Sequence, residues 1–128
     1  MLIVEDQEMM RHSLREFLQA AFPHETIREA QNAHQALAFC RDQPPRLVLM
    51  DVQLPDGNGI DLTAQLKAML PDTAIIVVSQ HSAQPYVERA LGAGADAYIT
   101  KDKVYRELLP AIERHSGLRR NRDATDAQ

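Results

Sequence analysis

The sequence contains a single cysteine, Cys40, among its 128 residues. One cysteine cannot form an internal disulfide, which fits a protein of the reducing cytosol. Cys40 lies in a segment of helical periodicity, so we interpret it as a small core residue. The chain also lacks a signal peptide and any apolar run near the roughly 18 residues that a membrane span needs. The sequence therefore predicts a soluble cytoplasmic protein that does not enter a membrane.

A basic excess is missing as well. The chain has 14 lysines and arginines against 18 aspartates and glutamates, a formal net charge of −4. That balance argues against a broad basic face, so we predict no direct nucleic-acid binding by this domain. Hydrophobic residues (45%) and charged residues (25%) occur in the proportions of one globular domain. The histidines show no metal-ligand spacing and are interpreted as surface residues: His12, His24, His34, His81 and His115.

Short apolar runs alternate along the chain with segments of helical periodicity. The apolar runs predict strands at 2–4, 26–30, 46–50, 74–78 and 97–100. The periodic segments predict helices at 7–22, 33–42, 59–70, 85–94 and 104–115. Pro110 should kink or interrupt the last helix, because proline lacks the N–H that a helix interior needs. Five strands, each followed by a helix, indicate an α/β fold with a parallel sheet and helices on both faces.

Polarity orders the predicted strands. The runs at 2–4, 46–50 and 74–78 are almost continuously apolar, as parallel strands covered on both faces are. The runs at 26–30 and 97–100 are mixed in polarity and suit the edges. A flavodoxin-like, doubly wound sheet of five parallel strands in the order 2-1-3-4-5, with five helices, satisfies this division.

The end of the last predicted helix marks the end of the predicted domain. We predict one domain over residues 1–116 and a tail or linker over 117–128, which has little apolar content. The arginines of this segment could contact nucleic acid, but a solvated linker is the preferred interpretation: Arg119, Arg120 and Arg122.

Polar residues follow four of the five predicted strands directly. Glu5 and Asp6 follow the first strand, and Asp51 follows the third. Ser79 follows the fourth, and Lys101 follows the fifth. Because the site of a doubly wound fold lies beyond the carboxyl ends of its strands, these side chains are expected to meet at one edge of the sheet.

Three carboxylates gathered without a cation repel one another. At about 4 Å and an effective dielectric near 20, each pair costs roughly 4 kcal/mol, and Lys101 offsets only part of this. A hard divalent cation would supply the rest; Mg²⁺ suits carboxylates, waters and a phosphate oxygen, and Mn²⁺ can substitute. Asp51 is then placed to attack a phosphoryl group and form an aspartyl phosphate. The metal and Lys101 would neutralise the phosphoryl oxygens, and Ser79 would donate a hydrogen bond to one of them.

Each of these residues also has a purely structural interpretation. Asp51 could be a turn residue, Asp6 could favour a helix N-terminus, and Lys101 could be a solvated lysine. Ser79 could be a helix cap, a role for which Ser82 competes. Their convergence on one edge favours the chemical interpretation.

Four segments together resemble the bacterial response-regulator receiver domain, the CheY-like family. They are "VED" (4–6), "LVLMDVQLPDGNG" (47–59), "IIVVSQ" (75–80) and "AYITK" (97–101). The resemblance runs from about residue 2 to residue 115. It is closest to receivers of LuxR-type transcriptional regulators, which carry a helix-turn-helix DNA-binding domain after the receiver.

The resemblance implies a signalling domain of a two-component system, and not an enzyme with an external substrate. A histidine kinase would phosphorylate Asp51, and the domain would catalyse only its own phosphotransfer and dephosphorylation. The domain would then form a homodimer or control transcription through a DNA-binding domain absent from this chain. By the same resemblance, Tyr98 would reorient when Ser79 moves, and Lys101 would contact the phosphoryl group. The implied metal ligands are Glu5, Asp6, Asp51 and the backbone carbonyl of Gln53.

The sequence departs from the family pattern at three places. Asp102 follows Lys101 where the family has a proline with a cis peptide bond; a non-proline cis bond costs about 3–4 kcal/mol, which favours trans here. Gln80 is larger than the usual residue after the hydroxyl. Gln53 and His81 occupy positions that modulate the lifetime of the phosphoryl group in the family.

Other functions remain open at this point. The chain could be a stand-alone receiver that acts by protein–protein interaction, or an unphosphorylated pseudo-receiver scaffold. A phosphatase of the haloacid dehalogenase type would need a second acid where Gln53 stands, and a flavin mononucleotide carrier would not place acids after the first strand. The residues expected on a switching face are Leu91, Tyr98, Val104 and Tyr105.

Overall fold

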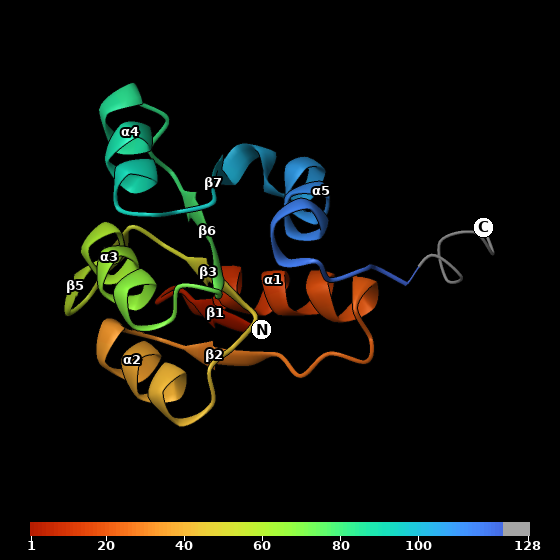
Figure 1. Cartoon of the computed structure of the whole chain (residues 1–128). Coiled ribbons are helices and arrows are strands. Elements are labelled where there is room, and N and C mark those ends of the chain that lie inside the picture. Colours follow the sequence, from red (N-terminus) through yellow and green to blue (C-terminus); the bar gives the residue numbers. More distant parts are fainter. Residues whose placement is uncertain (122–128) are drawn as a thin grey trace.

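The computed structural model describes residues 1–121 and contains one five-stranded parallel sheet in the order β2-β1-β3-β6-β7 (Figure 1). In chain order, this is the predicted arrangement 2-1-3-4-5, which is confirmed. The strands are β1 (Leu2–Val4), β2 (Arg28–Ala30), β3 (Leu47–Met50), β6 (Ala74–Ser79) and β7 (Ala97–Thr100). The helices are α1 (Glu8–Ala21), α2 (Ala33–Asp42), α3 (Gly59–Met69), α4 (Gln84–Gly92) and α5 (Val104–Ser116). The bounds differ from the predicted ones by at most two residues, and those of β1, α2 and β7 are as predicted.

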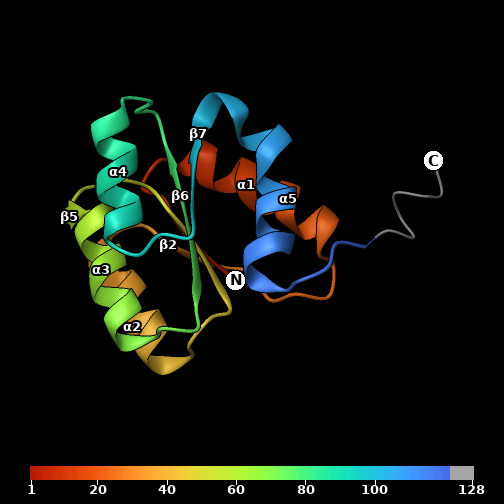
Figure 2. The same ribbon diagram turned by 45° about the horizontal axis from the view of Figure 1, so that its top comes forward.

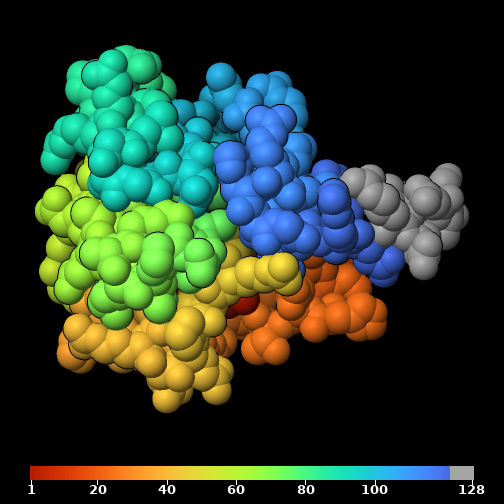
Figure 3. Space-filling view, in the orientation of Figure 1, coloured from red at the N-terminus to blue at the C-terminus, as the bar shows by residue number. Residues whose placement is uncertain are grey.

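The helices form two layers on opposite faces of the sheet. Helices α1 and α5 cover one face, and α2, α3 and α4 cover the other (Figures 1 and 2). In the space-filling view, α4, α3 and α2 form a continuous band down one side of the molecule (Figure 3). None of the helices within residues 1–121 is long and apolar enough to cross a membrane.

Each face of the sheet has its own hydrophobic core. Ile3, Leu49 and Ile76 point toward the α1/α5 layer, where they pack with Leu18 and Leu108. The alternate strand residues, Val4, Val48 and Val77, face the other layer. There they pack with Cys40 of α2, Leu66 of α3 and Ala90 of α4. Since both faces are covered, the central strands are apolar at every position except Ser79, the last residue of β6, as their sequences predict. The prediction that Cys40 is a core residue is confirmed.

A small hairpin between β3 and α3 was not predicted. It consists of β4 (Gln53–Leu54) and β5 (Gly57–Asn58), and the turn between them contains Asp56. The Asp56 carboxylate accepts hydrogen bonds from the backbone N–H groups of Ala33 and His34, at 2.7 and 3.0 Å, which lowers the pKa of this carboxyl. The hairpin is therefore tied to the N-terminus of α2, next to the carboxyl end of the sheet.

Pro110 lies inside α5, and the helix continues past it to Ser116. The prediction was that Pro110 kinks or interrupts this helix. The helix is not interrupted, and the kink stays a prediction. The cost of the missing N–H is offset by packing, because Val104, Leu108 and Ile112 are all fully buried along one face of α5. Pro110 itself is exposed.

Replacing Pro110 by alanine is expected to stabilise the protein. The substitution restores a backbone hydrogen bond within α5 and removes the clash of the ring with the preceding turn, a gain of up to about 3 kcal/mol in the free energy of unfolding. Urea denaturation measures the change. The control, Pro71→Ala, alters an exposed loop proline and should cost about 0.4–1 kcal/mol, because it frees the unfolded chain. A Pro110→Ala protein no more stable than the wild type would contradict this prediction.

The chain after α5 continues along the domain. Gly117 ends α5 in the left-handed conformation, with φ of 75°. Leu118 is buried in the α1/α5 core, and the backbone N–H of Asn121 donates to the carbonyl of Ala21 at 2.7 Å. Residues 122–128 of the predicted tail, with Arg122, lie outside the described residues. The boundary at residue 116 stays a prediction.

Candidate functional site

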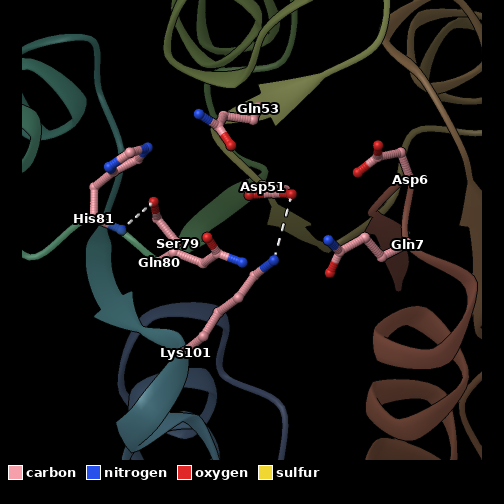
Figure 4. Close-up of a pocket in the computed structure, with 8 residues that line it drawn as sticks. All are labelled: Asp6, Gln7, Asp51, Gln53, Ser79, Gln80, His81 and Lys101. Atoms are coloured by element: carbon pink, nitrogen blue, oxygen red, sulfur yellow. Dashed lines mark hydrogen bonds and ion pairs between the residues drawn. The ribbon is translucent and has the colours of Figure 1, made fainter.

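A polar pocket lies at the carboxyl ends of the central strands (Figure 4). All five residues predicted to converge are found at this edge of the sheet. Four of them line the pocket together with Gln7, Gln53, Gln80 and His81: Asp6, Asp51, Ser79 and Lys101. The fifth, Glu5, lies directly behind and contacts Lys101.

The register of the strands brings these residues together. Val4 of β1 is opposite Met50 of β3, so the residues that follow the two strands, Glu5 and Asp51, are neighbours. The backbone N–H of Asp51 donates to the carbonyl of Val4 at 3.0 Å, which continues the ladder by one bond. At the other side, Ser79 is the last residue of β6 and pairs with Thr100, which directly precedes Lys101.

Lys101 pairs with two buried carboxylates. Its Nζ lies 3.1 Å from Oε1 of Glu5 and 3.5 Å from Oδ2 of Asp51. Glu5 is only 2% exposed and Asp51 only 8%. Burial, followed by the hydrogen bond and repulsion from Asp51, raises the pKa of Glu5 to about 8, although Lys101 acts in the opposite direction. The positive charge of Lys101 therefore does not fully offset the cost of keeping both buried carboxyls ionised.

The acids can share a cation. One carboxylate oxygen from each of Glu5, Asp6 and Asp51 lies within 4.8 Å of the others. Asp6 is exposed, which leaves one side of this cluster open to water or to a phosphate oxygen. In phosphate-binding sites Mg²⁺ takes carboxylate oxygens together with waters and phosphate oxygens, so an acidic cluster with an open side suits it, and a divalent charge would offset the repulsion that burial strengthens. The donor set therefore fits the predicted metal; the predicted backbone carbonyl of Gln53 stays a prediction.

Ser79, His81 and Tyr98 form a chain of hydrogen bonds at the rim of the pocket. The backbone N–H of His81 donates to Oγ of Ser79 at 3.1 Å, and the Tyr98 hydroxyl donates to the carbonyl of His81 at 2.6 Å. The His81 ring stacks on the ring of Tyr86, with centroids 4.2 Å apart and planes 6° apart. His81 is thus held at its backbone and at its ring, and Figure 4 shows it beside Ser79.

Two structural alternatives are excluded by this arrangement. Helix α4 has Ala83 as its N-cap with no side-chain hydrogen bond, so neither Ser79 nor Ser82 caps it. His81 is half-buried in the pocket, so its interpretation as an ordinary surface histidine was wrong, whereas the other four histidines are exposed. Tyr86, which positions the His81 ring, was not predicted as a site residue. Its stacking partner is five residues earlier, across a turn, and no periodicity signals such a pair.

Val104 is not part of a switching surface. It is the first residue of α5 and is fully buried in the α1/α5 core, where a partner cannot contact it, so the expectation that it belongs to the switching face was wrong. Leu91 and Tyr105 are exposed, and Tyr98 is half-buried.

The peptide between Lys101 and Asp102 is trans, since residues 1–121 contain no cis peptide bond. Lys101 begins a short 3₁₀ turn, η1 (Lys101–Lys103).

Gly59 fixes the backbone that carries Asp51. Its N–H donates to the carbonyl of Val52 at 2.7 Å, and a Cβ at this position would lie 1.9 Å from the backbone oxygen of Asp51. Gly59→Ala is therefore expected to lower the free energy of unfolding by about 3 kcal/mol or more, because backbone atoms must shift to remove the clash.

The matched control is Gly92→Ala at the end of α4, where an added Cβ meets nothing within 4 Å. It should raise the free energy of unfolding by about 0.5–1 kcal/mol, because alanine restricts the unfolded chain more than glycine does. Thermal denaturation of the two variants measures both changes. Equal stabilities of the two variants would refute the close approach at Gly59.

A model of the response regulator receiver domain family matches residues 1–113. The chain is 37% identical over 111 residues to the chemotaxis protein CheY of Halobacterium salinarum, an alignment that covers 87% of this chain and 91% of that protein. It is 36% identical over 116 residues to the transcriptional regulatory protein YhcZ of Bacillus subtilis, covering 91% and 54% of the two. The chain spans about half the length of such regulators, which include VraR of Staphylococcus aureus.

Solved structures agree with the sequence comparisons. A CheY-like receiver domain protein from Methanospirillum hungatei superimposes with a TM-score of 0.82 at 28% identity, over 99% of this chain and 96% of that one. A LuxR-family response regulator from Aurantimonas gives a TM-score of 0.81 at 27% identity, over 98% and 91%. The chain therefore belongs to the response-regulator receiver domain family, the signalling domains of two-component systems.

Proposed function

We propose that this domain accepts a phosphoryl group on Asp51 from a histidine kinase, with Mg²⁺ bound by the acidic cluster. The observation that carries the proposal is the meeting of Glu5, Asp6 and Asp51, whose carboxylate oxygens lie within 4.8 Å, with Lys101 between two of them. A receiver from another protein, at 25% identity, is described as BeF3-activated, which is in keeping with a phosphoryl-binding site here.

In the proposed reaction, a carboxylate oxygen of Asp51 attacks the phosphorus of a phosphohistidine. The P–O bond to Asp51 forms as the P–N bond breaks, and the electron pair leaves with the kinase imidazole. Bound Mg²⁺ would neutralise charge on the transferring phosphoryl oxygens, and Mn²⁺ could replace it. Glu5, Asp6, Asp51 and the backbone carbonyl of Gln53 would hold the metal.

Two side chains would stabilise the phosphorylated state. Lys101 already pairs with Asp51 and can move its ammonium to a phosphoryl oxygen once Asp51 is phosphorylated. The Oγ of Ser79 accepts a hydrogen bond from the backbone, so its own hydrogen is free to donate to the phosphoryl group. In this proposal Asp51, Lys101 and Ser79 act directly in a self-catalysed transfer and in the later dephosphorylation.

Ser79 would also act as the switch. Movement of Ser79 toward the phosphoryl group pulls on the N–H of His81, whose carbonyl holds the hydroxyl of Tyr98. A shift of Tyr98 would change the surface that it lines together with Arg106 and Glu107 of α5, and a partner that distinguishes the two surfaces would shift the equilibrium between them. The partner would be a second copy of the domain or a DNA-binding domain that follows in the full-length protein.

The output has two candidates, and both place the domain in the cytoplasm. The chain spans about half the length of the relatives that are transcriptional regulators, which supports a C-terminal DNA-binding domain in the full-length protein. The CheY relative is matched over 91% of its length, which supports a stand-alone receiver that acts by protein–protein interaction. Whether the natural open reading frame continues past Gln128 distinguishes the two. An unphosphorylated scaffold is the weaker alternative, because every predicted site position is filled.

The proposed phosphotransfer is tested with the wild-type protein and a small phosphodonor. Incubation with acetyl phosphate and Mg²⁺ is expected to add the mass of one phosphoryl group, and chelation of the metal should prevent the addition. Intact-mass spectrometry reads both results. A wild-type protein that stays unmodified with Mg²⁺ present would favour the scaffold.

A further inference from the structure

Arg11 is a buried arginine next to the acidic cluster, and it has no role in the proposed chemistry. It lies in the first turn of α1 and is only 8% exposed. Its Nη1 donates to the backbone carbonyl of Glu5 at 3.0 Å and lies 3.5 Å from the carbonyl of Asp6. Its backbone N–H donates to the carbonyl of Gln7 at 2.9 Å. One residue thus engages three consecutive carbonyls of the segment that carries two of the acids.

The other end of the guanidinium is anchored outside the site. Nε of Arg11 donates to Oε1 of Glu29 at 3.0 Å, and Glu29 belongs to β2. Arg11 therefore links the Glu5–Asp6 segment to the neighbouring strand as well as to α1. A planar guanidinium can form both sets of bonds at once, which a lysine ammonium on a flexible stem does less well.

If only its positive charge mattered, Arg11 would hinder the binding of a cation by the acidic cluster. A positive charge beside a cation site disfavours the cation, so an arginine here would weaken metal binding if its charge dominated. The Glu29 carboxylate is in direct contact with the guanidinium and offsets that charge. What remains is the geometry, namely hydrogen bonds that hold the backbone of two carboxylate ligands in one arrangement.

We propose that Arg11 is a positioning residue that pre-arranges the Glu5–Asp6 segment for a divalent cation. The proposal rests on the proposed function of the acidic cluster as a Mg²⁺ site. Groups that orient metal ligands in this way typically change metal affinity about 10- to 100-fold when removed. Loss of Arg11 is therefore expected to weaken Mg²⁺ binding by a factor in that range.

Arg15 is a matched control on the same helix. Its Nη1 donates to Oε2 of the same Glu29 at 3.1 Å and to the carbonyl of Ile27 at 2.7 Å. Both bonds lead away from the acidic segment. Arg15→Met removes an ion pair to Glu29 and the contact with the carbonyl of Ile27. Arg11→Met removes an ion pair to the same Glu29 and the contacts with the carbonyls of Glu5 and Asp6.

The first experiment measures Mg²⁺ affinity by titration calorimetry on the full chain. The Arg11→Met protein is expected to bind Mg²⁺ about 10- to 100-fold more weakly than the wild type, and the Arg15→Met protein within about twofold of it. Tighter binding by Arg11→Met, or equal weakening in both variants, would overturn the proposal. If Arg11→Met does not fold, Arg11→Lys takes its place, because lysine keeps the positive charge but lacks the planar set of N–H donors. Wild-type Mg²⁺ affinity in that variant would equally overturn the proposal.

The second experiment needs no metal. Amide hydrogen exchange of residues 6–8 in the metal-free protein should be roughly two- to tenfold faster in Arg11→Met, the effect expected from losing the 3.0 Å bond to the carbonyl of Glu5, and unchanged in Arg15→Met. Unchanged exchange in Arg11→Met would overturn the positioning role itself. If the wild type takes up no Mg²⁺ but the exchange result is as expected, the metal-binding proposal fails while the anchoring by Arg11 stands.

Discussion

Asp51→Asn protein is expected to gain no phosphoryl mass from acetyl phosphate and Mg²⁺ under conditions in which the wild type gains one. The carboxamide oxygen is uncharged and a poor nucleophile, so the bond to phosphorus cannot form at a useful rate. The substitution also removes one carboxylate from the acidic cluster and from the contact with Lys101. Intact-mass spectrometry after a fixed incubation shows the difference directly.

The matched control is Asp72→Asn, which alters an exposed aspartate in the loop between α3 and β6. This variant should be phosphorylated as fully as the wild type. Phosphorylation of Asp51→Asn at the wild-type level would place the acceptor at another residue and contradict the proposed function. Peptide mapping of the wild-type product then identifies the residue that carries the group.

Mg²⁺ is expected to stabilise the wild-type protein strongly, and Asp6→Asn is expected to abolish most of that effect. A ligand that binds only the folded state adds about 2.7 kcal/mol to the free energy of unfolding at 100 times its dissociation constant. Asp6 is the ligand to replace, because it is exposed and its loss leaves no unpaired charge in the core. Thermal denaturation with and without Mg²⁺ measures the stabilisation. A Mg²⁺-induced shift of wild-type size in Asp6→Asn would count against Asp6 as a ligand.

The stability of the metal-free protein is expected to fall as the pH rises. The pKa of Glu5 is about 8 in the folded protein, against an ordinary value of 4.5. Between these two values the folded state binds more protons than the unfolded state, so raising the pH favours unfolding. Denaturant titrations at pH 5, 6.5 and 8 without metal test this. Glu5→Gln should flatten the dependence and Glu88→Gln, at an exposed position on α4, should leave it unchanged; a dependence that survives Glu5→Gln would assign it to another group.

The order of the strands and the position of the site were predictable for a local reason. A strand covered on both faces must be apolar at every position, and the first polar residue after it must stand where the core ends. Glu5, Asp51 and Ser79 follow from that rule, since each stands at the end of a central strand or directly after it, whereas Lys101 follows the edge strand β7. The parallel arrangement then brings them to the same edge of the sheet.

Other features depend on how helices and loops pack against the sheet, and the pattern of apolar and polar residues along the chain did not predict them. Val104 begins α5 and points into the α1/α5 core, although its neighbour Tyr105 is exposed. The stacking of His81 on Tyr86 depends on the path of the loop before α4. The continuity of α5 through Pro110 depends on the packing of its buried face, which outweighs the local preference.

The sequence by itself determined the alternation of strands and helices, the strand order and the identity of the residues at the edge of the sheet that carries the acidic cluster. These follow from periodicity and from where apolar runs stop, which are properties of neighbours along the chain. Only the tertiary structure decided that Lys101 lies between Glu5 and Asp51, and that Arg11 holds the carbonyl of Glu5 while it pairs with Glu29. Contacts of that kind join residues on different elements, so their geometry is set by the packing of helices against the sheet and by no local pattern.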